Sequence, residues 1–264
     1  MARRSFSMIG RLSVLMILLS PIASRAESIK VGTTSGPHAE ILDIVTQQAQ
    51  LNDLDIEIVE FNDFVMPNEA LASGDLQANT FQTRPFLENY TLQSGNDLIE
   101  VAKTYVLPMG FYSEKYDSFD EVPAGGMIAI QNDPTNAARA LLLLQAEGIV
   151  TLRDGGTESS GVIDIESNPR RLTFVELEAA QLARTLVDVD VAAINTSYAL
   201  KAGLNPASDP ILREKQDSPY SNVIAIRRVD EDAPWVSKLI TAYQSEAVRQ
   251  FLASELKGAA VPAW

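Results

Sequence analysis

The 264-residue sequence contains no cysteine and only one histidine, His38. Without cysteine the chain can form no disulfide framework, no thiolate metal site and no catalytic thiol. With one histidine it cannot build a multi-histidine metal site, and a serine–histidine–aspartate triad would have to use His38. We therefore expect neither a resident metal nor a cofactor.

The sequence also lacks the short motifs of nucleotide-binding and hydrolytic enzymes: there is no GxGxxG after a strand, GxxxxGK[ST], HExxH or GxSxG. Paired carboxylates remain possible among 35 acidic residues, although most carboxylates in so acidic a chain lie on the solvated surface. His38 follows the first predicted strand, where ligands gather in α/β sheets, but a structural role is favoured over catalysis. We expect a binding protein and not an enzyme.

Basic residues are scarce, and four of the arginines stand in the first 26 residues, which contain no acid. This segment has an apolar run at 12–19, a break at Pro21, and small residues Ser24 and Ala26 at the −3 and −1 positions of a cleavage site. The run is too short for a span of roughly 20 residues, so residues 1–26 are predicted to be a secretory signal peptide. The mature chain has 17 basic and 35 acidic residues, a net charge of −18, which disfavours nucleic acid and anionic membrane surfaces as partners.

From residue 27 onward, strand and helix patterns alternate. Strands are predicted over 27–34, 54–61, 76–81, 126–133 and 172–178, and helices over 39–53, 66–73, 134–148, 179–190 and 235–256. The segment NTFQTRPF is read as a proline-bearing turn. Two extended segments, near 104–112 and 220–228, join two α/β units. This order predicts two lobes, each a mixed, mostly parallel sheet flanked by helices, with a cleft between them as the ligand site and a double crossing as the hinge.

The stretch QNDPTNAARALLLL, residues 131–144, places Arg139 in a helix that is otherwise mostly apolar. Asp133 or Thr135 caps the helix start, and Asn136 precedes Arg139 on the same face. Free amide groups and the helix dipole favour an anion at this end, and a guanidinium presents a planar fork that suits a carboxylate. Two interpretations are open, an arginine that binds a ligand carboxylate and a structural arginine.

Two asparagines stand at similar places: Asn195 ends an apolar strand, and Asn222 begins the second crossing. An asparagine there is usually a turn former, but in a cleft its amide can accept from an ammonium and donate to a carboxylate. Aromatic residues cluster early, and such spacing is more typical of a core than of a pocket. They are Phe61, Phe64, Phe81, Phe86 and Tyr90.

Six segments, in the same order along the chain, resemble blocks of the methionine-binding MetQ/NlpA family, the substrate-binding components of bacterial methionine ABC importers. They are FNDFVMPNEAL, GDLQANTFQTRPFL, NDPTNAARALLLLQ, VELEAAQLARTL, AAINTSYA and SPYSNVIA. The resemblance runs from about Ile29 to the C-terminus. It implies a type II-like periplasmic-binding-protein fold, for which we expect lobe 1 to comprise 27–107 with 225–264 and lobe 2 to comprise 108–224. Such a protein closes on a free amino acid, here methionine, and delivers it to the permease and ATPase of the importer.

The resemblance also implies roles for individual residues. Arg139 of the NDPTN block would clamp the ligand carboxylate, and Asn195 of the INT block would help to hold that end. Asn222 of the SPYSN block would meet the α-ammonium or the carboxylate. Phe64 and Phe81 would line the side-chain pocket, where a thioether packs well against ring edges.

The chain departs from the family pattern in this pocket and near its N-terminus. Thr83 stands where the family commonly has histidine, and Phe86 and Phe64 stand where tyrosine is common or frequent. A more apolar pocket follows, which fits methionine or admits a different amino acid or a methionine derivative. A periplasmic enzyme on the same fold is the alternative from another class. Because the family is typically lipid-anchored through a cysteine that this sequence lacks, we expect a monomer that diffuses in the periplasm without a lipid anchor.

Overall fold

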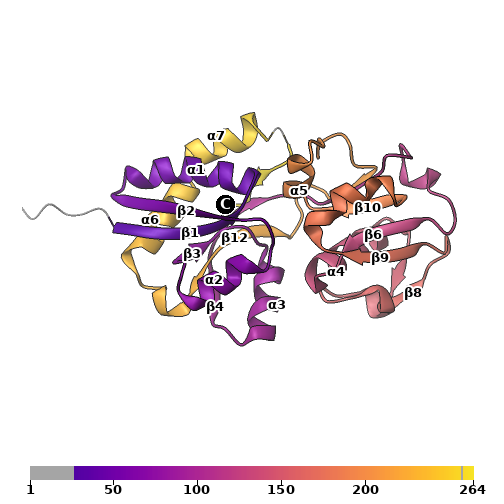
Figure 1. Ribbon diagram of the computed structural model, residues 1–264, viewed down its shortest axis with the longest axis horizontal. Coiled ribbons are helices and arrows are strands. Elements are labelled where there is room, and N and C mark those ends of the chain that lie inside the picture. Colours follow the sequence, from indigo (N-terminus) through magenta and orange to yellow (C-terminus); the bar gives the residue numbers. More distant parts are fainter. Residues whose placement is uncertain (1–26, 257) are drawn as a thin grey trace, which may run out of the picture.

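The computed structural model describes residues 27–256 and 258–264, so the predicted signal peptide lies outside the described residues. Two lobes lie side by side along the long axis of the molecule (Figure 1). Each lobe is built on one large sheet. In the described part of the chain, none of the helices has the length and apolar character that a membrane span requires.

The first lobe contains a six-stranded sheet in the order β13-β4-β12-β3-β1-β2. Its strands are β1 (Glu27–Thr34), β2 (Leu54–Phe61), β3 (Ala78–Asn79), β4 (Leu98–Val106), β12 (Ser221–Arg227) and β13 (Val261–Pro262). Its helices are α1 (Pro37–Gln50), α2 (Met66–Ser73), α3 (Arg84–Ser94), α6 (Pro234–Tyr243) and α7 (Glu246–Ser254), with the 3-10 turn η5 (Arg228–Asp230). Strand β1 pairs in parallel with β2 and β3, whereas β12 pairs antiparallel with β3 and β4.

The second lobe contains a five-stranded sheet in the order β11-β5-β10-β6-β9 and a separate two-stranded sheet. Its strands are β5 (Gly110–Tyr112), β6 (Met127–Gln131), β7 (Thr151–Leu152), β8 (Ile165–Ser167), β9 (Thr173–Leu177), β10 (Val191–Ile194) and β11 (Leu212–Arg213). Its helices are α4 (Pro134–Ala146) and α5 (Thr196–Lys201), with 3-10 segments η1 (Phe119–Glu121), η2 (Arg153–Gly155), η3 (Val162–Asp164) and η4 (Ala179–Val187). Strand β6 pairs in parallel with β9 and β10, whereas β5 pairs antiparallel with β10 and β11.

Helices cover both faces of each sheet, and the central strands are therefore buried on both sides. Along β12, Ile224 and Ile226 pack in the cluster that contains α1, α6 and α7, while Val223 and Ala225 pack on the opposite face with residues of α2 and α3. The four residues of β10 alternate in the same way between the clusters of α4 and of η4 with α5. Figure 1 shows α1 and α7 above the first sheet and α2 and α3 below it.

The chain crosses between the lobes twice, at 107–109 between β4 and β5, and at 214–220 between β11 and β12. The two-lobed α/β fold with a double crossing is confirmed, and the antiparallel share of each sheet is larger than the sequence pattern indicates. Because β12 belongs to the first sheet, the second crossing ends before Ser221. The lobe bounds of 27–107 with 225–264, and of 108–224, stay a prediction.

Three elements differ from their sequence prediction. The helix predicted over 235–256 is broken into α6 and α7, because the side chain of Ser245 accepts a hydrogen bond from the Val248 amide at 3.3 Å and starts a new helix. The segment read as a turn opens α3, with Pro85 in its first turn, where an amide hydrogen is not needed. The helix predicted over 179–190 is the 3-10 helix η4.

Candidate ligand-binding site

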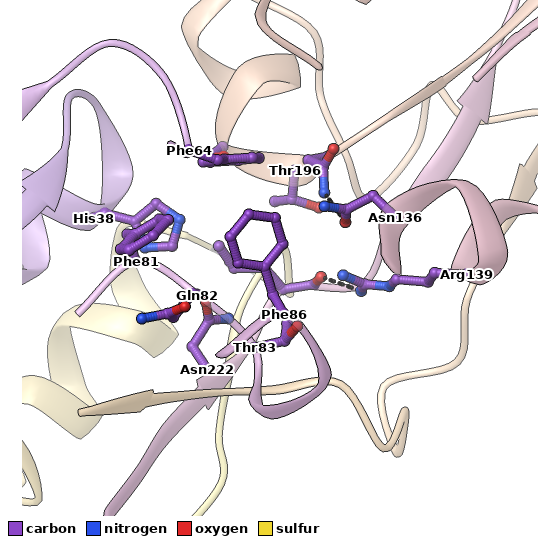
Figure 2. A pocket seen from close by; sticks show the side chains of 13 residues that line it. His38, Phe64, Phe81, Gln82, Thr83, Phe86, Asn136, Arg139, Thr196 and Asn222 are labelled. Atoms are coloured by element: carbon purple, nitrogen blue, oxygen red, sulfur yellow. Dashed lines mark hydrogen bonds between the residues drawn. The ribbon is translucent and has the colours of Figure 1, made fainter. Parts of the chain in front are cut away.

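A cavity is lined by residues of both lobes and of the first crossing (Figure 2). Its lining consists of His38, Phe64, Phe81, Gln82, Thr83, Phe86, Leu107, Asn136, Arg139, Asn195, Thr196, Ser197 and Asn222. The structure therefore brings together all seven candidates from the sequence, which are Phe64, Phe81, Thr83, Phe86, Arg139, Asn195 and Asn222. None of the lining residues is acidic, and in the described parts of the chain no three acidic or histidine side chains converge on a metal position.

Arg139 reaches the cavity from α4, and the local sequence explains how this helix starts. Asp133 caps it, since its Oδ1 accepts a hydrogen bond from the Asn136 amide at 2.9 Å. Pro134 occupies the first position, where a missing amide hydrogen costs nothing. The sequence left Asp133 and Thr135 as alternative N-caps, and in the structure the cap is Asp133.

The guanidinium of Arg139 is already engaged by protein groups on two of its nitrogens. Nε donates to Oε1 of Glu214 at 2.8 Å, and Nη2 donates to Oε2 of Glu214 at 2.6 Å and to the Leu107 carbonyl at 2.9 Å. The guanidinium also stacks on the Tyr220 ring, 4.6 Å from its centroid. Among the described residues no acceptor contacts Nη1. The fork is therefore occupied by Glu214, and one nitrogen remains for a ligand anion.

Glu214 was not found from the sequence, because nothing in its local pattern distinguishes it from the many surface acids. It stands at the start of the second crossing, and its Oε2 also accepts from the Met109 amide of the first crossing at 2.9 Å. Its side chain is 8% exposed and that of Arg139 is 4% exposed. The pair thus joins α4 of the second lobe to both crossings.

A chain of amides orients Asn195. Gln131 donates from Nε2 to Oδ1 of Asn195 at 2.8 Å, and Asn195 donates from Nδ2 to Oδ1 of Asn136 at 2.8 Å. Asn136 in turn donates to Oδ1 of Asp133 at 3.0 Å. These residues lie at the ends of β6 and β10 and at the start of α4, where the ends of parallel strands meet.

Asn222 lies at the start of β12 and forms an isolated antiparallel bridge with Thr83. Its Nδ2 donates to the Tyr105 carbonyl at 3.2 Å. In residues 27–256 and 258–264 no donor contacts its Oδ1, which is thus a neutral acceptor in a cavity without carboxylates. A carbonyl oxygen of this kind suits a ligand ammonium.

Three phenylalanines form the apolar wall of the cavity. The ring centroids lie 5.9 Å apart for Phe64 and Phe81, 6.1 Å for Phe64 and Phe86, and 6.0 Å for Phe81 and Phe86. The ring of Tyr198 backs Phe64 at 4.9 Å. In Figure 2 Arg139 enters from the right, Phe64 and Phe81 lie toward the left, and Phe86 lies between them and Arg139. Each of these three residues borders the cavity, and their role in binding a ligand stays a prediction.

His38 is the second residue of α1 and is 2% exposed. Gly36, with φ of 94°, turns the chain from β1 into this helix, a backbone conformation that favours glycine. The Nδ1 of His38 lies 2.6 Å from the Tyr105 hydroxyl. Burial lowers the pKa of His38 to about 4, so the imidazole is neutral at neutral pH and adds no charge to the cavity.

Helix α5 of the second lobe contacts the first lobe directly. The Tyr198 hydroxyl donates to the Asn62 carbonyl at 3.2 Å. Nζ of Lys201 donates to Oγ of Ser35 at 2.7 Å and to Oδ1 of Asn62 at 3.1 Å. Ser35 and Asn62 follow β1 and β2, so these contacts bind the two lobes to each other across the cavity side of the molecule.

The family model described as NlpA lipoprotein matches residues 29–264. The D-methionine-binding lipoprotein MetQ of Salmonella typhi is 44% identical over 239 residues, which cover 89% of this chain and 88% of that protein. A nutrient binding protein from Burkholderia cenocepacia, solved bound to methionine, is 46% identical with a TM-score of 0.87, covering 89% of this chain and 100% of that one. A periplasmic substrate-binding protein of an ABC transporter from Coxiella burnetii is 41% identical with a TM-score of 0.86, with coverage of 89% and 100%.

These names correct one expectation from the sequence. The sequence predicted a protein that diffuses in the periplasm without a lipid anchor. That prediction is wrong, because the matching family and the relative from Salmonella typhi are both named lipoproteins. It depended on the absence of cysteine alone. The lack of one residue type does not establish how a protein is held at a membrane.

Proposed function

Because the chain belongs to the NlpA lipoprotein family, we propose that it is the substrate-binding component of an ABC importer and binds free methionine in the cavity between its lobes. The relatives named for methionine binding and for ABC transport support this function. The observation that carries it is the division of one cavity into a cationic end at Arg139 and a wall of three phenylalanines.

In this proposal the ligand carboxylate accepts from Nη1 of Arg139 and from the free amide hydrogen of Asn195. The α-ammonium donates to Oδ1 of Asn222, and the thioether packs between Phe64 and its two ring neighbours. The bidentate clamp expected for Arg139 is replaced by a contact through one nitrogen, because Glu214 occupies the other edge of the guanidinium.

Ligand binding couples to the lobes through the two crossings, 107–109 and 214–220, which are the natural hinge. We propose that the closed form docks on the permease of the importer, whose ATPase drives transport, and that the protein is a monomer. No bond is made or broken in this cycle, and the cavity residues need only hold and release the ligand. Light scattering measures the molar mass in solution and so tests the monomeric state. The docking is tested by whether the liganded protein raises the rate of ATP hydrolysis by a reconstituted importer.

The test of the function uses protein that has been unfolded, dialysed and refolded to remove bound ligand. Thermal unfolding is then followed with each amino acid, including both enantiomers of methionine. A ligand at 100 times its Kd stabilises the native state by about 2.7 kcal/mol. We expect methionine to raise the melting temperature and glycine or glutamate to leave it unchanged. If none of the α-amino acids raises the melting temperature, the proposal is contradicted.

A second candidate is a binding protein for a different amino acid or a methionine derivative. Thr83 and Phe86 favour it, since their side chains leave the wall with fewer hydrogen-bond donors than a histidine and a tyrosine would supply. The same panel distinguishes the two candidates by the ligand that gives the largest shift.

A further inference from the structure

Both crossings between the lobes contact one pair of buried side chains, Arg139 and Glu214. From the first crossing, the Leu107 carbonyl accepts from Nη2 of Arg139 at 2.9 Å, and the Met109 amide donates to Oε2 of Glu214 at 2.9 Å. Glu214 itself begins the second crossing, and Tyr220 at its end stacks on the guanidinium, 4.6 Å from centroid to Cζ. The two segments of the hinge are therefore joined through this pair.

These contacts hold the guanidinium of Arg139 in one orientation. Its Nε and Nη2 face the two oxygens of Glu214 at 2.8 and 2.6 Å, and the Tyr220 ring covers one of its faces. A guanidinium bound at two points cannot rotate about its terminal bonds without breaking charge-assisted hydrogen bonds. Arg139 borders the cavity, and within the described parts of the chain (27–256 and 258–264) no acceptor contacts its Nη1. The position of this nitrogen is thus set by groups on the other edge.

We propose that Glu214 is a positioning residue of ligand binding, which holds Arg139 in the orientation that receives the ligand carboxylate. Glu214 does not line the cavity, so it acts through Arg139 and not on the ligand. Because the same carboxylate accepts the Met109 amide, it also links the bound ligand to the first crossing. The inference rests on the proposed function and adds the residue through which occupation of the cavity reaches the hinge.

Electrostatics alone predicts the opposite effect of Glu214 on binding. Its carboxylate places a negative charge beside the cation that receives the ligand carboxylate, and like charges repel each other. If Glu214 only balanced the charge of Arg139, its removal would tighten the binding of methionine. If Glu214 positions Arg139, its removal weakens that binding. The sign of the change in affinity therefore distinguishes the two roles.

The first test is Glu214→Gln, which keeps the length of the side chain and replaces one acceptor oxygen by a donor amide. We expect the folded variant to bind methionine about 5- to 150-fold more weakly than the wild type in calorimetry, the usual range for coupling between two groups. Unchanged or tighter binding in this variant overturns the inference and leaves the proposed function intact. If the wild type itself binds no methionine, the proposed function fails and the inference with it.

The matched control for this test is Asp230→Asn. Asp230 pairs with Arg227 at 2.6 Å, with side-chain exposures of 24% and 21%, and both residues lie in the first lobe outside the two crossings. Neither residue lines the cavity. We expect Asp230→Asn to keep the wild-type affinity for methionine. A loss as large as that in Glu214→Gln overturns the specific role of Glu214.

Arginine side-chain nuclear magnetic resonance tests the orientation itself. Restricted rotation should give separate signals for the Nη protons of Arg139 in the wild type, which are assigned by their absence from Arg139→Lys. We expect these signals to merge into an average in Glu214→Gln, because the two-point contact is lost, and to stay separate in Asp230→Asn. Separate signals in folded Glu214→Gln overturn the inference, since the guanidinium is then held without Glu214.

A second variant loosens Arg139 without changing Glu214, so that the inference does not depend on the folding of Glu214→Gln. Tyr220 is 8% exposed and does not line the cavity. In Tyr220→Leu the apolar bulk is kept and the stacked ring is removed. We expect methionine to bind about 2- to 30-fold more weakly, the range that corresponds to loss of one cation–π contact. Wild-type affinity in Tyr220→Leu overturns the inference that the held orientation of the guanidinium governs binding.

Discussion

The guanidinium of Arg139 and the carboxylate of Glu214 form a two-point ion pair, with Nε–Oε1 at 2.8 Å and Nη2–Oε2 at 2.6 Å. Both side chains are almost completely buried, and Glu214 also accepts the Met109 amide of the first crossing. The two interpretations of Arg139 that the sequence leaves open are therefore compatible. One edge of the guanidinium is structural, and among the described residues Nη1 has no hydrogen-bond acceptor.

Removal of Arg139 should destabilise the fold as well as weaken binding. In Arg139→Ala, the Glu214 carboxyl group stays buried without its partner, and breaking a buried pair in this way costs about 3–5 kcal/mol. Urea unfolding measures the loss. The matched control is Arg84→Ala, which breaks a similar two-point pair with Glu100 on the surface, where side-chain exposure is 48% and 17%. That change should cost under about 1 kcal/mol. Equal losses in the two variants contradict the prediction.

A double variant at Arg139 and Glu214 should recover stability without recovering ligand binding. Arg139→Met/Glu214→Leu replaces both charges by apolar side chains of similar volume, a change that is often neutral for stability. We expect the double variant to be more stable than Arg139→Ala and to bind no methionine, because the ligand carboxylate has lost its cation. Urea unfolding and calorimetry on the same samples measure both quantities. Methionine binding at wild-type affinity would remove Arg139 from the site.

Local patterns were sufficient to predict what lies within one element. The cap and proline of α4 place Arg139 one turn into the helix, and the apolar runs of β12 and β10 indicate extended segments. The prediction that the seven candidate residues lie in one cavity came from the resemblance to a family. The partners that orient them are out of reach of local patterns, since Glu214 is 75 residues from Arg139 and Tyr105 is 67 from His38. The break before Ser245 was missed because the apolar stripe continues from α6 into α7.

The buried imidazole of His38 should make the free energy of unfolding decrease as the pH is lowered. Its pKa is lowered by burial from 6.5 to about 4, so below pH 6.5 the unfolded chain binds a proton that the native state does not. This contribution is fully present above pH 6.5 and is lost as the pH falls toward 4. The phenol that contacts it, Tyr105, and the neighbouring phenol Tyr243 stay neutral because burial raises the pKa of both.

The size of this effect follows from the shift, and a variant isolates it. Between pH 7.5 and pH 4.5 the histidine should remove about 2–3 kcal/mol of unfolding free energy. Carboxylates titrate in the same range, so the measured quantity is the difference between wild type and His38→Gln, in which the surface carboxylates are unchanged. We expect the variant to lose less stability over this interval in urea unfolding. Parallel losses in the two proteins contradict a neutral buried His38.

The contacts of Lys201 with Ser35 and Asn62 should prolong ligand retention. They join the second lobe to the first at 2.7 and 3.1 Å, and they exist only while the lobes are together. In Lys201→Met the apolar stem is kept and the donors are removed. With a net contribution of about 0.5–1.5 kcal/mol for such hydrogen bonds, methionine should dissociate about 2- to 12-fold faster.

A lysine that makes comparable contacts inside one lobe provides the control for Lys201→Met. Lys238 lies on α6, and its Nζ donates to the Asp53 carbonyl at 3.2 Å and pairs with Glu27 at 3.7 Å, all within the first lobe. In Lys238→Met the closed state loses nothing relative to the open state, so the dissociation rate should equal that of the wild type. Displacement of radiolabelled methionine by an excess of unlabelled methionine measures all three rates. If Lys201→Met releases ligand at the wild-type rate, the α5 contacts do not stabilise closure, and retention depends on the cavity and the two crossings alone.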